Sequence, residues 1–154
     1  MNIEHIALWV SDIERVKNFY QTYFHATSSD IYHNKRTKFT SYFLSFTDGA
    51  RLEIMHQPDI MNNHGALHIE FCGYAHFAMS LGTSQAVDAL TEQLRKDGYP
   101  VVREPRTTGD GYYESIVLDP EGNKIELTIW CELRKARKRS ASTSVSLDRY
   151  RVTV

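Results

Sequence analysis

Four residues of two types could form a metal site: His5, Glu53, His76 and Glu126. Imidazole nitrogens and carboxylate oxygens together suit a divalent ion such as Zn²⁺, Ni²⁺, Co²⁺, Fe²⁺ or Mn²⁺. Each glutamate lies between aliphatic residues, in the triplets LEI and IEL. Burying such a carboxylate is costly unless a cation or donor pairs with it. One strand histidine or glutamate alone is more often structural, so the metal hypothesis depends on what the four residues share.

What they share is an equivalent place in two similar stretches of chain. The segment IEHIALWV alternates so that His5, Ala7 and Trp9 share one face, which is typical of a strand. Ser11 and Glu14 then predict a capping box at the start of a helix. Apolar residues at three- and four-residue spacing give that helix one stripe. The stripe consists of Ile13, Val16, Phe19, Tyr20, Tyr23 and Phe24. A β-branched and aromatic run, TKFTSYFLSF, and the turn Asp48-Gly49 predict a hairpin that ends in ARLEIMH.

The same order of elements returns about seventy residues later. AHFAMSL predicts a strand, Thr83 or Ser84 caps a second helix, and Gly98 ends it. The segments YPVVREP, YYESIVLD and KIELTIW then predict three strands, with a turn at 120–123. Both halves therefore read β-α-β-β-β. In the alignment of the two halves, His5 falls on His76 and Glu53 on Glu126, at offsets of 71 and 73 residues.

This duplication sets the predicted domain organisation. We expect one domain over residues 1–131, built of units 2–57 and 73–131, with 58–72 as the connection. Residues 132–154 form a basic extension with seven Lys or Arg against two acidic residues. A basic run can attract nucleic acid or anionic lipid. Because this one lacks interleaved aromatic residues, we expect no nucleic-acid or membrane partner, and instead a poorly ordered tail or a segment packed on another subunit.

The composition is that of an ordinary globular protein. Of its 154 residues, 42% are hydrophobic and 24% are charged. No apolar run approaches the ~18 residues of a membrane span, so we expect a cytoplasmic protein. Cys72 and Cys131 form no C-x-x-C pattern, which indicates buried free thiols rather than a disulfide or a thiolate metal site.

The paired units, the segment EHIALWVSDIERVKNFY and the closing LDPEGNKIEL together resemble the vicinal oxygen chelate superfamily, and within it the glyoxalase I-like proteins. The resemblance covers about residues 2–130. It implies an α+β fold in which two tandem β-α-β-β-β units form a curled, barrel-like mixed sheet around a metal cavity. It also implies a homodimer.

The resemblance further implies a function. His5, Glu53, His76 and Glu126 would bind the metal, with Zn²⁺ or Ni²⁺ foremost and Co²⁺, Fe²⁺ or Mn²⁺ as alternatives. The protein would be a lactoylglutathione lyase-like metalloenzyme acting on a small-molecule substrate through a metal-bound enediolate. Glu126 would be the catalytic base, and Glu53 its counterpart on the other face of the substrate.

Two positions depart from the glutathione-dependent members of the family. Trp9 stands where an arginine is usual, and Gln57 where asparagine is favoured. A different thiol adduct or another oxygenated substrate is therefore an open alternative. Basic residues that could bind an anionic substrate, or could simply be solvated, are Lys35, Arg36, Lys38, Arg103 and Arg106. Other functions open within the superfamily are a thiol transferase, an epimerase and a non-catalytic, bleomycin-resistance-like drug-binding protein.

Overall fold

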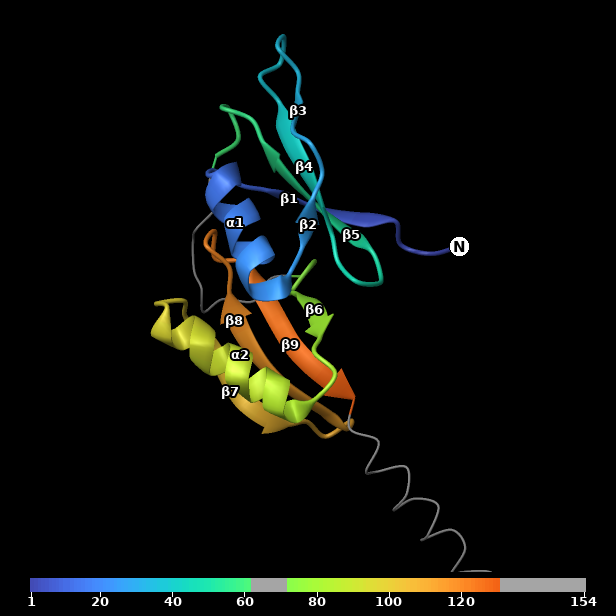
Figure 1. Ribbon diagram of the computed structural model, residues 1–154, viewed down its shortest axis with the longest axis vertical. Coiled ribbons are helices and arrows are strands. Elements are labelled where there is room, and N and C mark those ends of the chain that lie inside the picture. The colour runs from blue at the N-terminus through green and yellow to red at the C-terminus, as the bar shows by residue number, and fades with distance from the viewer. Residues whose placement is uncertain (62–71, 131–154) are drawn as a thin grey trace, which may run out of the picture.

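The computed structural model describes residues 1–61 and 72–130, which form two units that follow one another along the long axis of the molecule (Figure 1). The first unit contains β1 (His5–Trp9), α1 (Ile13–Phe24), β2 (Thr27–Ser28), β3 (Tyr32–His33), β4 (Thr40–Ser45) and β5 (Arg51–His56). The second contains β6 (Phe77–Ser80), α2 (Ser84–Lys96), β7 (Val101–Thr107), β8 (Tyr112–Leu118) and β9 (Lys124–Trp130). The fold is α+β with two tandem β-α-β-β-β units, as predicted.

Each unit has its own mixed sheet. In the first, the strand order is β1-β5-β4-β2, with β3 also paired to β4; in the second it is β6-β9-β8-β7. The first strand of each unit runs parallel to the last, and the other pairs are antiparallel. The second strand of the first unit is reduced to two pieces of two residues, whereas its equivalent, β7, is continuous over seven.

The helix N-termini show one prediction confirmed and one wrong. Thr83 caps α2 by accepting a hydrogen bond from the backbone N–H of Ala86 at 3.1 Å. At α1, however, the cap is Asp12, which accepts from the N–H of Arg15, and not Ser11. The Ser11 hydroxyl instead donates to the Glu121 carboxylate at 2.6 Å. A carboxylate from a turn 110 residues away thus displaces the local capping box.

The two units share one hydrophobic core, to which both helices contribute. Val16 and Tyr20 of α1 and Val87 and Leu94 of α2 are fully buried in it. α2 covers one face of the sheet formed by β7, β8 and β9 (Figure 1). The opposite face of each sheet is therefore the one that the core leaves available for a functional site.

The turn between β8 and β9 fastens the two units together. The Tyr20 hydroxyl donates to Asp119 Oδ2 at 3.1 Å, and both groups are buried. Glu121 accepts hydrogen bonds from the Ser11 hydroxyl and from the N–H of Asp12. The sequence predicts this turn but not its contact with α1.

Candidate metal centre

The first predicted pair, His5 and Glu53, lies on the face of the first sheet that points away from the core. β1 and β5 run side by side with Ala7 opposite Glu53, so His5 is diagonal to the glutamate across the two strands. His5 Nε2 is 3.8 Å from Glu53 Oε2. The neighbours of Glu53, Leu52 and Ile54, point into the core and are buried, which fixes the strand and leaves the Glu53 side chain 15% exposed.

The second pair repeats this arrangement in the second sheet. His76 directly precedes β6. Glu126 on β9 is opposite Ala78, which follows His76 by two residues, just as Ala7 opposite Glu53 follows His5 by two. His76 Nε2 is 3.0 Å from Glu126 Oε2. Ile125 and Leu127 anchor the strand in the core at 0% exposure, and the Glu126 side chain is 14% exposed.

The chain thus brings each histidine to the glutamate of its own unit, but does not bring the two pairs together. Among residues 1–61 and 72–130, no group of three or more His, Cys, Asp or Glu side chains lies close enough to hold one metal ion. A single subunit therefore presents two half-sites of two candidate ligands each.

The geometry of each half-site can be compared with what one ion requires. Two ligand atoms bound about 2.1 Å from a Zn²⁺ ion lie about 3.0 Å apart at a right angle and about 3.4 Å apart at the tetrahedral angle. The 3.0 Å separation in the second pair falls in this range, and the 3.8 Å separation in the first exceeds it slightly. The nitrogen and oxygen donors of both pairs fit a divalent ion.

The other ring nitrogen of His5 has a partner, Glu4, that no sequence pattern indicates. His5 Nδ1 contacts the Glu4 carboxylate, which also accepts a hydrogen bond from Arg51. Both hydrogen bonds lower the pKa of the Glu4 carboxyl, and the one from His5 has the larger effect. With Nδ1 engaged, Nε2 is the nitrogen directed to Glu53. A carboxylate on the far nitrogen commonly orients a metal-binding histidine.

Aromatic side chains extend from the first half-site along the same face. Trp9, two residues beyond Ala7 on β1, is 44% exposed and packs edge-to-face on Phe39 with ring centroids 6.0 Å apart. Phe39 in turn packs on Tyr32. The neighbouring basic residues of the loop 34–38, Lys35, Arg36 and Lys38, are exposed. Trp9 therefore belongs to an exposed aromatic surface beside the first half-site.

Two arginines and a glutamate lie on the corresponding face of the second sheet. Arg103 Nη1 and Arg106 Nη2 are 3.9 Å and 3.5 Å from the same oxygen, Oε1 of Glu114. Both arginines are candidates from the sequence, but Glu114 was missed because strand alternation alone does not place it with them.

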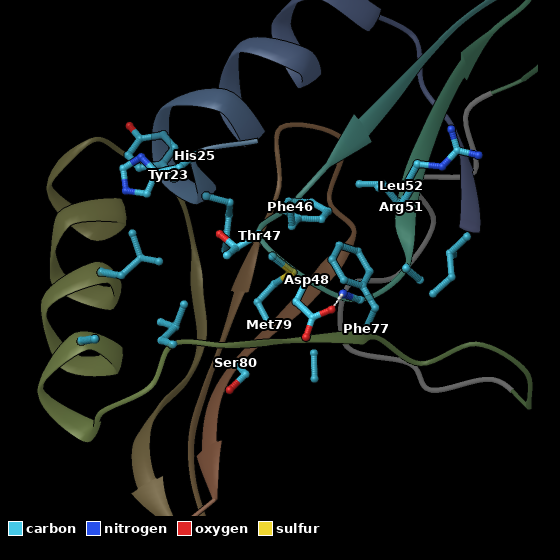
Figure 2. Close-up of a pocket in the computed structure, with 18 of the residues that line it drawn as sticks. Tyr23, His25, Phe46, Thr47, Asp48, Arg51, Leu52, Phe77, Met79 and Ser80 are labelled. Atoms are coloured by element: carbon cyan, nitrogen blue, oxygen red, sulfur yellow. Dashed lines mark hydrogen bonds between the residues drawn. The ribbon is translucent and has the colours of Figure 1, made fainter. Parts of the chain in front are cut away.

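A separate cleft of about 1000 Å³ lies between the units (Figure 2). It is bounded by the end of α1, the β4–β5 hairpin, β6 and the start of α2, with largely apolar side chains such as Phe46, Phe77 and Met79. None of the four predicted ligands lines it. The cleft is therefore distinct from both half-sites.

Known proteins share the sequence pattern and the fold of this chain. The sequence profile of the Glyoxalase/Bleomycin resistance protein/Dioxygenase superfamily matches residues 2–127. No curated protein sequence matches the chain. In the part of the chain that the structure describes, no helix is long and apolar enough to cross a membrane.

Several solved structures share the architecture. A trypanothione-dependent glyoxalase I from Leishmania major is 20% identical with a TM-score of 0.65, over 94% of this chain and 96% of that one. A glyoxylase/bleomycin resistance protein/dioxygenase domain from Frankia sp. EAN1pec is 15% identical with a TM-score of 0.70, over 84% and 98%. Glyoxalase I from Zea mays is 21% identical with a TM-score of 0.66; 84% of this chain aligns with 45% of that protein. At these identities the likeness shows the fold.

Proposed function

The chain belongs to the Glyoxalase/Bleomycin resistance protein/Dioxygenase superfamily, and we propose that it is a metal-dependent enzyme of the glyoxalase I type. The proposed ligands are His5, Glu53, His76 and Glu126, with Zn²⁺ or Ni²⁺ as the foremost ions. The observation that carries the proposal is the repeated half-site, in which each unit directs a histidine Nε2 at a glutamate oxygen at 3.8 Å and 3.0 Å.

We further propose that a complete site forms between two copies of the chain. Two protein ligands are too few for a catalytic Zn²⁺ site, which commonly has three. Since one subunit keeps its two pairs apart, the first unit of one copy would face the second unit of another. A two-fold symmetric dimer would then contain two identical sites, each with two histidines and two glutamates.

The proposed reaction moves a proton between adjacent carbons of the substrate. A divalent ion held by the four ligands would polarise two neighbouring substrate oxygens and so acidify the C–H bond beside the carbonyl. Glu126 would accept that proton on a carboxylate oxygen and return it to the next carbon, which isomerises a hemithioacetal to a thioester without loss of any atom. Its place between two buried aliphatic residues holds the carboxylate in one position and limits its contact with water. Glu53 would occupy the equivalent position on the other face of the substrate.

The proposed substrate is the adduct of a small 2-oxoaldehyde and a thiol other than glutathione. The aromatic pair Trp9 and Phe39 lies on the face of the first half-site, where a carboxylate of glutathione would need a cation. The same aromatic surface also favours a second candidate, a binding protein that holds a flat drug molecule without turnover.

Metal analysis together with activity assays tests the proposal. The wild type would be purified without chelator, and its metal content compared with that of Glu126→Gln. The control is Glu92→Gln, the same change at an exposed ion-paired residue of α2. Methylglyoxal would be assayed with glutathione, trypanothione, cysteine and coenzyme A. We expect metal and turnover in the wild type and the control, and turnover to be lost in Glu126→Gln. Less than about a tenth of an equivalent of metal after reloading would refute the metalloenzyme and favour the binding protein. Bound metal without turnover on any thiol adduct would leave the metal site standing and refute the glyoxalase I activity.

A further inference from the structure

Arg103, Arg106 and Glu114 form an ionic cluster on the same face of the second sheet as the proposed ligand Glu126. The strand register shows this directly. Arg103 is opposite Ile116, and Ile116 is opposite Glu126, so the three residues form one row across β7, β8 and β9. Residues opposite one another in a sheet share a face, and two strand spacings amount to about 10 Å. An arginine side chain is long enough to cover much of that distance.

A distortion in β7 places both arginines on this face. Arg103 and Arg106 are three residues apart, a spacing that puts side chains on opposite faces of a regular strand. The register between β7 and β8 shifts between Arg103, which pairs with Ile116, and Arg106, which pairs with Glu114. Three steps on β7 thus match two steps on β8, as in a β-bulge, and bulges often redirect a side chain beside a functional site.

The charges of the cluster do not cancel. One carboxylate, that of Glu114, faces two guanidinium groups, which leaves the cluster with a formal charge of +1. The Glu114 side chain is 10% exposed, whereas those of Arg103 and Arg106 are 49% and 53% exposed. Both contacts are long and go to one oxygen, at 3.9 Å and 3.5 Å. Each guanidinium carries five N–H donors in a planar fork that matches a carboxylate or phosphate.

We propose that Arg103 and Arg106 bind an anionic group of the substrate that occupies the metal site. This inference rests on the proposed function and narrows it: the substrate carries a carboxylate or phosphoryl group several ångströms from its two metal-binding oxygens. Glu114 positions the two guanidinium groups side by side, and an anion would complete the charge balance of the cluster. The aromatic surface of the first unit would contact the uncharged part of the same molecule.

Hydroxamates that present two adjacent oxygens provide a direct test, because they mimic the chelating part of such a substrate. The probes are acetohydroxamate, succinate monohydroxamate, its methyl ester and a phosphonate analogue of the same length. Their dissociation constants would be measured by calorimetry on the metal-loaded wild type, on the double variant Arg103→Gln/Arg106→Gln and on Arg95→Gln. Arg95 is a matched control, since it is half exposed and pairs with Glu92 and Glu104 on another surface.

We expect the wild type to bind the carboxylate at least about tenfold more tightly than the ester. The ratio of the dissociation constants of the ester and the carboxylate should fall close to one in the double variant and stay unchanged in Arg95→Gln. Comparison of the phosphonate with the carboxylate shows which anion the wild type prefers. Equal affinity for carboxylate and ester in the wild type would overturn the inference, as would a preference that survives in the double variant. If acetohydroxamate binds but the carboxylate and its ester bind equally well, the inference fails and the proposed function stands. If no metal and no hydroxamate bind, the proposed function fails with it.

Discussion

Replacement of Tyr20 by phenylalanine is expected to reduce the free energy of unfolding by about 1.5–2 kcal/mol. The tyrosine is fully buried, and its hydroxyl donates to the buried carboxylate of Asp119 at 3.1 Å. A buried hydrogen bond to a charged group contributes about 1.5–3 kcal/mol. We expect the lower part of this range because Asp119 keeps three other donors: the N–H groups of Glu121 and Asn123 and the side-chain amide of Asn123, at 2.8–2.9 Å. The ring itself stays packed against Phe24 and Phe77.

Guanidinium unfolding, followed by tryptophan fluorescence and circular dichroism at one protein concentration, measures this change. Tyr74→Phe is the matched control, because Tyr74 is fully exposed, and its stability should stay within about 0.5 kcal/mol of the wild type. A loss below about 0.5 kcal/mol in Tyr20→Phe, with an unchanged denaturant slope, would refute the reasoning. The hydroxyl would then not help to hold α1 on the second unit.

Three further changes test other parts of the structure. Burial raises the pKa of the Asp119 carboxyl above its ordinary value of 3.8. The native state therefore binds the carboxyl proton more tightly than the unfolded state does, and the free energy of unfolding should fall as pH rises from 3.8 through the raised pKa. Asp119→Asn should remove this pH dependence in denaturant unfolding measured at several pH values. Glu4→Gln should weaken metal binding about tenfold or more if Glu4 orients His5, and calorimetry that shows unchanged affinity would contradict that role. Thr83→Ala should cost about 1 kcal/mol by removing the α2 cap, and a thermal melt equal to that of the wild type would contradict the assigned cap.

Most helices, strands and turns could be predicted because the signals for them come from residues close together in the sequence. The turn at Asp48-Gly49 and the end of α2 at Gly98 are both confirmed, and Gly49 and Gly98 have the positive φ angles, +87° and +88°, that their positions require. The prediction that Ser11 caps α1 is wrong, because the Ser11 hydroxyl binds Glu121, a residue remote in sequence. No local sequence pattern indicates that a carboxylate from the second unit will contact Ser11.

The candidate site was predictable in residue types but not in arrangement. The duplication singles out His5, Glu53, His76 and Glu126, and their role as ligands stays a prediction. That each histidine meets the glutamate of its own unit depends on the parallel pairing of β1 with β5 and of β6 with β9. The cluster around Glu114 depends on a β-bulge, which alternation cannot reveal.

Subunit mixing tests the central claim, a metal site shared between two copies, most directly. One variant carries His5→Ala and Glu53→Ala, and the other carries His76→Ala and Glu126→Ala, so neither homodimer should bind metal. After the two are unfolded together and refolded, half of the dimers are mixed, and each mixed dimer has one site with all four native ligands. We predict recovery of about a quarter of the wild-type metal content and activity. Folded mixed dimers that bind no metal would contradict a shared site.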